Sequence, residues 1–442
     1  MTDQYRTLIL PAKVLFPLGL GTALSLMGDA TLYAVLPTHT IHAGIVLGSV
    51  GILLGANRAV RIVSNGLAGL AYDRWPRRRL FVPALFIGAL STAVYAATRG
   101  FWPLLVGRLL WGLAWSGIWV GGATMILDVT MDHDRGRWTG LYQTWFFLGS
   151  ASGAFAGGLL TDKLGYTAAM WVGATLTALG GLVALFLLPE TRGCRFKVET
   201  RSAGASTLRL RDNGGLWVAA SVQGMTRFVA SGVLSATLGL LAQGWLEATP
   251  LALGVATLTG ALAAGRAVLS MVAAPLAGTI SDWLRSRWKV VAWGLAIGVV
   301  SMALVAAGAP AAILAGVSLV AVARGTTQAL VTALTGDLVS QEQRGRAIGL
   351  VHTAGDLGSA VGPPVAYALL SWIGLQGVYV LCAVLLAVEL GIVVSLRKLV
   401  CASKANRLPK RRSSRSMGLP NSAISSAFPP ALPASHQDEV IP

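Results

Sequence analysis

Long apolar windows, separated by short polar connections, follow one another along almost the whole chain. A bilayer core about 30 Å thick is crossed by about 20 predominantly apolar residues in a helix. Windows of that size recur twelve times, so the pattern predicts twelve transmembrane helices. The predicted spans are 14–36, 43–70, 80–98, 102–128, 138–162, 166–189, 215–243, 251–280, 289–308, 311–338, 346–372 and 375–397.

The spans divide into two groups of six on either side of a polar, basic stretch. We expect an N-terminal six-helix bundle over 1–189, a cytoplasmic linker over 190–214 and a C-terminal six-helix bundle over 215–397. The remaining residues, 398–442, are rich in Ser, Pro and Arg and lack a helical period. This composition predicts a disordered basic tail on the cytoplasmic side.

The two groups of spans repeat each other in sequence. The segment RGRWTGLYQTWFFLGSASGA, which begins at Arg135, matches RGRAIGLVHTAGDLGSAVGP, which begins at Arg344, at an offset of 209 residues. The same offset relates Gly69 to Gly278, Asp73 to Asp282 and Asp128 to Asp337. The expected fold is therefore an all-α polytopic membrane protein of two pseudo-symmetric bundles, with a substrate site between the halves near mid-membrane.

Composition and charge agree with a membrane protein. Hydrophobic residues make up 54% of the chain and charged residues only 12%, against roughly 25% charged in a soluble domain. The net charge of +17 lies mainly in alternate connections and in the termini, which the positive-inside rule places in the cytoplasm. Nucleic acid is therefore not needed to explain the charge. The three cysteines and five histidines are scattered, so we expect no metal, cofactor or disulfide framework.

The segment GLAYDRWPRR, from Gly69 to Arg78, resembles the signature loop between helices 2 and 3 of the major facilitator superfamily, with Pro76 where the family has Gly. A weaker copy, GTISDWLR, runs from Gly278 to Arg285. The resemblance implies a conformational latch in which acidic side chains bind helix-terminal amides and pair with arginines across the halves, favouring an outward-open state. A plain positive-inside loop is the alternative. The latch would comprise Gly69, Asp73, Arg74, Arg77, Arg78, Asp128, Arg135, Gly278, Asp282, Asp337 and Arg344.

Further motifs resemble the drug:proton antiporter group of the same superfamily. RLLWG, from Arg108, is similar to the family's buried-arginine motif, with Trp111 where Gln is usual, and PETR at 189–192 ends the sixth span as in many members. Helix 5 resembles the antiporter glycine motif except that Ala154 replaces Pro, whereas helix 11 keeps Pro363. Close packing through small residues is the alternative role. The glycines concerned are Gly149, Gly153, Gly157, Gly158, Gly358 and Gly362.

Ionisable residues inside the predicted spans are the candidate chemistry, since each costs at least about 2.5 to 3.5 kcal/mol to insert. Three are acidic: Asp29, Asp356 and Glu389. The surroundings of the first two resemble the drug:proton antiporters and vesicular amine transporters, which implies proton or cation binding there. The basic candidates for coupling or for an anionic substrate are Arg58, Arg108, Arg227, Arg266 and Arg324. Structural ion pairs are the alternative.

Arg58 and Arg266 look like partners in the repeat. Each is followed by Ala-Val and precedes the signature glycine of its half, Gly69 or Gly278, by about a dozen residues. At 1.5 Å per residue this spacing predicts a depth near mid-membrane for both arginines.

These features predict a secondary transporter that exports a small organic solute in exchange for protons. An importer of an anionic metabolite is the alternative, and a non-transporting receptor is a weaker one. Isolated histidines and the absence of a nucleophile motif argue against an enzyme. We expect a monomer in a bacterial cytoplasmic membrane, with both termini cytoplasmic, and the solute, protons and lipid bilayer as its partners.

Overall fold

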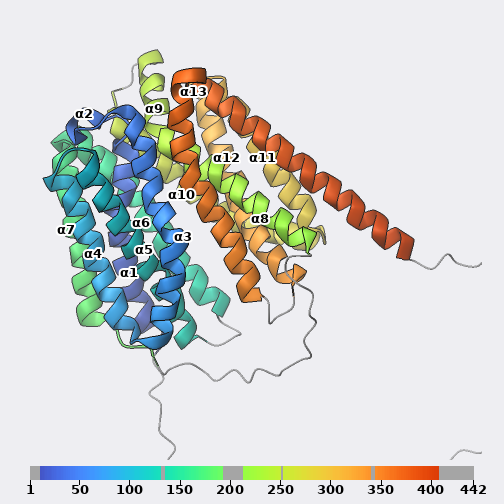
Figure 1. The fold of residues 1–442 in the computed structure, drawn as a ribbon, viewed down its shortest axis with the longest axis horizontal. Helices are drawn as coiled ribbons and strands as arrows, with labels where there is room; N and C mark the ends of the chain where they lie inside the picture. Colours follow the sequence, from blue (N-terminus) through green and yellow to red (C-terminus); the bar gives the residue numbers. More distant parts are fainter. Residues whose placement is uncertain (1–9, 131–134, 193–212, 250–251, 340–343, 408–442) are drawn as a thin grey trace, which may run out of the picture. The chain divides into compact units, whose positions relative to one another are not determined.

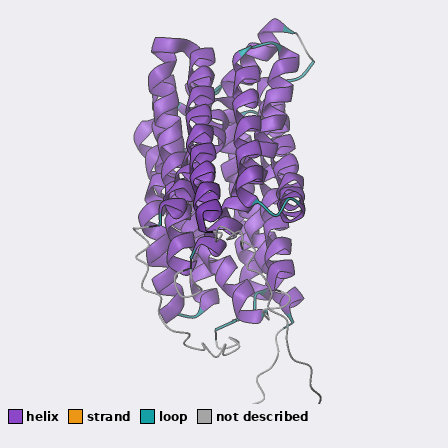
Figure 2. Cartoon of the chain, turned by 90° about the vertical axis from the view of Figure 1, so that its right-hand side faces the viewer, coloured by secondary structure: helices purple, strands orange, loops and turns teal. Residues whose placement is uncertain are grey.

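A computed structural model describes residues 10–130, 135–192, 213–249, 252–339 and 344–407 of the chain. Within these ranges the regular structure is helical and no strand occurs (Figure 2). The chain forms two units, Met1–Lys398 and Leu399–Pro442, and the first contains the helical bundle.

The N-terminal half consists of long helices joined by short turns (Figure 1). Its helices are α1 (Pro11–Val35), the short α2 (Thr40–Ala43), α3 (Leu47–Arg74), α4 (Arg77–Ala97), α5 (Phe101–Val129), α6 (Arg135–Leu164) and α7 (Tyr166–Leu187). The C-terminal half begins with a composite span, α8 (Gly214–Arg227), the π-helix η2 (Phe228–Val233) and α9 (Leu234–Ala248). It continues with α10 (Val255–Trp283), α11 (Arg287–Ala306), α12 (Pro310–Leu338) and α13 (Arg344–Arg407).

Helix α13 contains two of the predicted spans. Gly374 has φ 66°, a left-handed conformation that favours glycine, and it divides α13 into two arms. With these arms counted separately and α8, η2 and α9 counted together, the described residues contain the twelve predicted spans. The all-α fold prediction is thus confirmed. Helix α13 also continues through Arg407, beyond the start of the segment expected to be disordered, and residues 408–442 of that segment lie outside the described part.

Two of the twelve spans are less apolar than the other ten. Nine described helices are long and apolar enough to cross a membrane, and neither α3 nor α6 is among them. Both helices lie at the contact between the halves: polar side chains of α3 bond to the C-terminal half, and α6 contacts α10. Their lower hydropathy fits this position, because part of each helix faces the other half rather than lipid.

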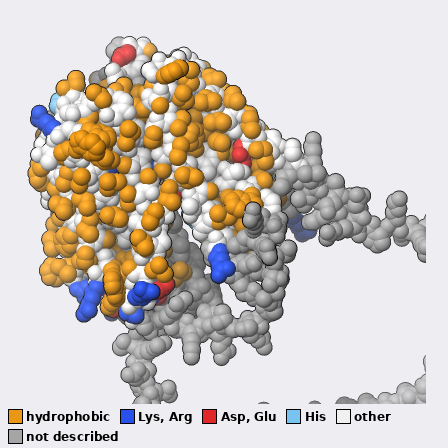
Figure 3. Space-filling view, in the orientation of Figure 1, with side chains coloured by type: hydrophobic (Ala, Val, Ile, Leu, Met, Phe, Trp, Pro, Cys, Tyr) orange, Lys and Arg blue, Asp and Glu red, His pale blue; other side chains and the backbone are white. Residues whose placement is uncertain are grey.

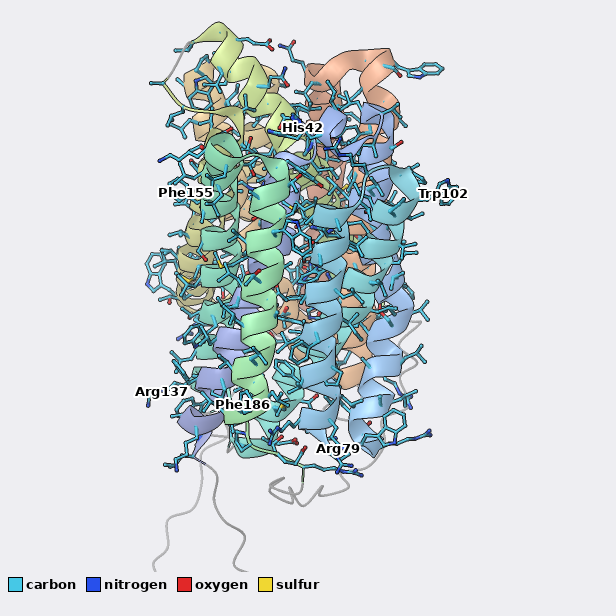
Figure 4. The ribbon with its side chains drawn as sticks, turned by 90° about the vertical axis from the view of Figure 1, so that its left-hand side faces the viewer. His42, Arg79, Trp102, Arg137, Phe155 and Phe186 are labelled. Carbon is cyan, nitrogen blue, oxygen red and sulfur yellow. The ribbon has the colours of Figure 1, made fainter. Side chains whose placement is uncertain are left out.

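The two ends of the bundle differ in charge. Arg79 and Arg137 lie at one end, here called the basic end, and His42 lies at the opposite end, here called the far end (Figure 4). On the face shown in Figure 3, hydrophobic side chains cover most of the helices, and Lys and Arg gather mainly at one edge. Large exposed apolar residues such as Phe186, at 76% exposure, suit contact with lipid tails rather than water.

The halves meet through a pair of contacts related by the repeat. A Cβ on Gly51 of α3 would lie 2.6 Å from the carbonyl oxygen of Pro363 on α13. Gly260 of α10 approaches the carbonyl of Ala154 on α6 in the same way. Gly260 follows Gly51 by 209 residues, and Pro363 follows Ala154 by the same number. The duplication seen in the sequence is therefore also a duplication of the interface.

The halves are joined in the middle and at the far end. Among the described residues, the hydrogen bonds between halves connect Arg58, Arg61, Asn65 and Asp162 to the C-terminal half. Towards the basic end, Gly69 and Gly278 face open space. The structure therefore represents a state closed at the far end.

Candidate functional site

Asp29 belongs to a buried ion pair inside the N-terminal half. Oδ1 of Asp29 on α1 lies 2.5 Å from Nη1 of Arg108 on α5, whose side chain is only 1% exposed. Nε of Arg108 donates to the carbonyl of Leu53 on α3 at 3.1 Å. Arg108 also lies over the ring of Tyr33, 5.1 Å from its centroid. These contacts tie α1, α3 and α5 together and neutralise the Asp29 charge.

Asp356 links the two halves near the middle of the bundle. Its Oδ1 lies 3.4 Å from Nη2 of Arg61 on α3 and 3.1 Å from Nη1 of Arg227 on α8. Its Oδ2 accepts a hydrogen bond from Nδ2 of Asn65 at 3.2 Å. The Asp356 side chain is 8% exposed. A change in its charge would therefore act on α3 of one half and α8 of the other together.

Arg58 and Arg266 bind neighbouring carbonyls of η2. A π-helix has wider turns than an α-helix and often marks a functional position. Arg58 on α3 donates through Nη1 to the carbonyl of Ser231 at 2.7 Å. Arg266 on α10 donates through Nη2 to the carbonyl of Ala230, also at 2.7 Å. The predicted repeat partners thus approach one segment from different halves.

Arg324 lies in the same positively charged region without such a bond. It is half-buried on α12, and its side chain makes no hydrogen bond or ion pair with any residue that the structure describes. Its electrostatic neighbours are Arg58, Arg227 and Arg266. Together with Arg61 and Arg108, these residues make six intramembrane arginines. The neighbouring carboxylates are only two in the described part, Asp29 and Asp356.

Glu389 is not brought into this cluster. It is buried on the second arm of α13 and accepts a hydrogen bond from Oγ of Ser221 on α8 at 2.6 Å. Within the part of the chain that the structure describes, none of its interaction partners is basic. The structure therefore separates the third predicted acidic residue from the other two.

The proposed latch residues form bonds within each half rather than between halves. Nε of Arg77 lies 3.0 Å from Oδ2 of Asp128, and both side chains are buried. Nη1 of Arg287 lies 3.0 Å from Oδ2 of Asp337, in a more exposed pair. Asp73 is exposed and makes no ion pair with the described residues.

The other latch residues show the same separation at the basic end. Asp282 and Arg74 are exposed, without a side-chain bond among the residues described. Arg78 donates to the carbonyl of Leu185, inside its own half. The side chains of Arg135 and Arg344 lie outside the described part. A bond between the halves at the basic end requires the halves to approach each other there. In the described part of the chain, neither the latch motif of the N-terminal half nor its copy in the C-terminal half makes such a bond.

Glu190 has a role at the basic end that sequence reasoning missed. Its carboxylate accepts from the backbone amides of Arg77 at 2.9 Å and Arg78 at 3.1 Å. These are the first amides of α4, which lack partners inside the helix. The available signal was the PETR segment, which places an acid directly after the sixth span.

Asp162 is a second residue that the sequence did not single out. Its Oδ2, at the end of α6, accepts from the amide of Thr257 at 2.7 Å and from the Thr257 hydroxyl at 2.6 Å. Thr257 lies in the first turn of α10, in the other half, and the N-cap Gly254 offers no side chain. Asp162 thus caps a helix of the opposite half and holds the far end closed.

The predicted glycine motifs lie at close helix contacts. On α6, Gly149, Gly153 and Gly157 face Ala23, Met27 and Thr31 of α1, and Gly158 faces Ala256 of α10. On α13, Gly358 faces Gly224 of α8, and Gly362 faces Gly232 of η2. A Cβ at any of these six positions would meet a neighbouring helix at less than 3 Å. Close approach is thus their structural role in this state.

A repeated pair of six-helix bundles with charged groups between its halves is typical of polytopic membrane transporters. The family model described as Major Facilitator Superfamily matches residues 18–268 and 216–430. The chain therefore belongs to the Major Facilitator Superfamily, and it is an integral membrane transporter.

Curated relatives are similar over part of their length. The chain is 30% identical over 176 residues to the tetracycline resistance protein, class C, of Escherichia coli, which covers 39% of this chain and 44% of the relative. It is also 30% identical over 164 residues to the synaptic vesicular amine transporter of Bos taurus, covering 37% and 31% of the two chains. The matched regions thus span less than half of these relatives.

Solved structures are similar over nearly the whole chain. A bacterial homologue of the human lysosomal transporter Spinster, in an inward-facing and unoccupied conformation, superposes with TM-score 0.72 at 16% identity, covering 89% of this chain and 97% of that one. The nucleoside transporter NupG gives 0.68 at 15% identity, covering 87% and 99%. At these identities the likeness establishes the fold alone.

Proposed function

We propose that the protein is a proton-coupled secondary transporter that exports a small organic solute by alternating access. The observation that carries this proposal is the position of Asp356, whose carboxylate binds Arg61 of one half and Arg227 of the other. Protonation removes the charge that attracts both arginines. Proton binding would therefore loosen the link that Asp356 of α13 makes between α3 of one half and α8 of the other, which connects titration to the relative motion of the halves.

Asp29 has a different role in this proposal. Its partner Arg108 lies in the same half and is fully buried, so the pair moves as one body with the N-terminal bundle. Neutralising Asp29 would leave an uncompensated buried arginine, which is strongly destabilising. We therefore place the coupling proton on Asp356 and assign Asp29 to the integrity of the N-terminal half.

Orientation and direction complete the proposal. We place the basic end in the cytoplasm of a bacterial cell, with both termini and the linker on that side, because basic residues concentrate in those connections. The far-end closure then corresponds to an inward-facing state of a monomeric transporter. Export is supported by similarity to proteins named for tetracycline resistance. Import of an anionic metabolite is the second candidate, and the surplus of buried arginines favours it.

Reconstituted vesicles can test the coupling. Purified protein in liposomes loaded with a pH-sensitive dye should move protons when tetracycline, amines or organic acids are supplied from one side. Asp356→Asn should transport the active solute without moving protons or responding to a pH gradient. Glu247→Gln, an exposed acidic site at the end of α9, serves as the matched control and should keep both activities. Solute flux in the unchanged protein that ignores the pH gradient would refute proton coupling.

A further inference from the structure

We propose that the transported solute is an organic anion and that its carboxylate or phosphate group binds between Arg58 of α3 and Arg324 of α12. The inference rests on the proposed transport function but not on its direction or on proton coupling. It is carried by the charges and bonding partners of the side chains at the contact between the halves.

The intramembrane arginines carry a surplus of positive charge. Two carboxylates, Asp29 and Asp356, are shared among three of the intramembrane arginines, namely Arg108, Arg61 and Arg227. The other three, Arg58, Arg266 and Arg324, have no acidic partner among the described residues. Uncompensated charges are costly at this depth and normally mark a functional site. A bound anion supplies the missing negative charge.

Arg58 and Arg324 are the arginines whose side chains can take a new partner. Among the described residues, the hydrogen-bond acceptors of Arg58 are all uncharged: the carbonyls of Ser231 at 2.7 Å and Ser359 at 3.4 Å. A hydrogen bond to a charged acceptor is roughly twice as strong as one to a neutral acceptor. An entering carboxylate can therefore displace these carbonyls. Arg324 needs no displacement, because its side chain has no bond to the described residues.

Arg58 and Arg324 also have suitable exposure and position. Arg58 and Arg324 are half-buried, whereas Arg108 and Arg266 are buried, so the first two remain within reach of a solute. One belongs to the N-terminal half and the other to the C-terminal half. An anion held by both would bridge the halves, and it would release Arg58 from η2. Binding would thus act directly on the contact that alternating access must break.

The arrangement also disfavours a cationic solute. Both carboxylates in the region already bind arginine. Tyr33, an aromatic ring suited to an ammonium group, already has Arg58 at 5.2 Å and Arg108 at 5.1 Å from its centroid. A cation would therefore meet occupied ligands and several like charges.

A thermal-shift panel on the purified protein tests the charge of the solute. The probes are citrate, succinate, benzoate and glucose 6-phosphate, set against glucose, choline and tetraphenylphosphonium at equal ionic strength. A ligand that binds the folded state raises the melting temperature. At least one anion should stabilise the protein, and the neutral and cationic probes should not. Stabilisation by a cation alone, or by no anion in the panel, would overturn the inference.

Variants test the assigned residues. Arg324→Gln should weaken binding of the active anion by about tenfold to a hundredfold, because one charge-assisted bond is lost. Arg324→Lys should retain much of the affinity and shows that the site tolerates substitution. Arg99→Gln, at an exposed arginine of the far-end connection, is the matched control and should bind normally. Unchanged affinity in folded Arg324→Gln would contradict the assignment.

Counterflow separates this inference from the proposed coupling. Exchange of labelled for unlabelled anion across vesicles needs no proton gradient. Anion counterflow that is indifferent to pH would preserve the anion site and refute proton coupling. Proton-linked transport of a neutral or cationic solute would refute the anion site and preserve proton coupling.

Discussion

The cap that Asp162 provides to α10 predicts a shift in the conformational equilibrium when it is removed. Asp162→Ala deletes the acceptor for the Thr257 amide and hydroxyl, which lie 2.7 Å and 2.6 Å from Oδ2. Only the far-end-closed state contains this bond, because the two residues belong to opposite halves. The substitution should therefore favour the state in which the far end is open.

The structure sets the size of the effect. Loss of a helix N-cap costs about 0.5 to 2 kcal/mol. Exposure of Asp162 to solvent limits the free energy by which the cap stabilises the closed state, but the side chain makes two short bonds. We therefore expect its removal to cost the closed state about 1 to 2 kcal/mol. The ratio of open to closed far ends should rise about 5- to 30-fold. Asp162→Asn should have a smaller effect, since Asn is also a good cap.

Two spin labels on exposed positions can measure this ratio. Ile41, on α2, and Glu247, at the end of α9, belong to different halves and suit distance measurements by electron paramagnetic resonance. Gly254→Ala should reproduce the shift without a change of charge, because a Cβ there would meet the Asp162 carboxylate. Lys163→Gln changes the neighbouring charge but not the cap.

Asp162→Ala, Gly254→Ala and Lys163→Gln must be compared with one another. If Asp162→Ala and Gly254→Ala both leave the label distances unchanged, the cap does not control far-end closure. If Lys163→Gln shifts the distances as much as Asp162→Ala does, the effect is one of surface charge rather than capping.

Three further predictions concern stability. Asp128→Asn should lower the free energy of unfolding by about 3 to 5 kcal/mol, because it leaves buried Arg77 without its counter-charge. Asp337→Asn should lower it by at most about 1 kcal/mol, because its pair with Arg287 is more exposed. Chemical denaturation in detergent measures both values. Gly374→Ala should lower the melting temperature, with a cost of about 1 to 3 kcal/mol, because φ 66° with ψ 176° is adopted almost only by glycine; equal stability would refute this prediction. Burial lowers the pKa of His39 below 6.5, so the unfolded chain binds more protons and stability should fall as pH drops below 6.5; His39→Gln should flatten this dependence in melts between pH 5 and 8.

The arrangement of helices was predictable because it depends on periodic burial. The twelve apolar windows and the offset of 209 residues specify two related bundles, and the structure has both. The common depth of Arg58 and Arg266 also followed from their spacing to Gly69 and Gly278. In the structure the two side chains bind adjacent carbonyls of η2.

The bonding partners were not predictable, because they depend on helix rotation and on the register between halves. Nothing in the sequence near Asp356 specifies that it binds Arg61 and Arg227 rather than another arginine. The Asp162 cap is hidden for a similar reason. A cap is normally sought beside its helix, but the N-cap of α10 is Gly254 and the acceptor comes from α6.

The interface combines symmetric backbone contacts with asymmetric charges. Gly51 against Pro363 and Gly260 against Ala154 are one contact made twice. The acidic residues Asp29, Asp356 and Asp162 have no such duplicates: their counterparts at the offset of 209 are Leu238, Phe147 and Ser371. The first turn of α3, whose N-cap is Val46, receives no such side-chain bond from the described residues. Both halves can repeat a packing contact, but the bonds of these acidic residues are not repeated. Protonation or anion binding therefore acts unequally on the two repeat-related sides of the interface. A signal at one charged group can then favour one direction of rocking, which a fully symmetric interface would not allow.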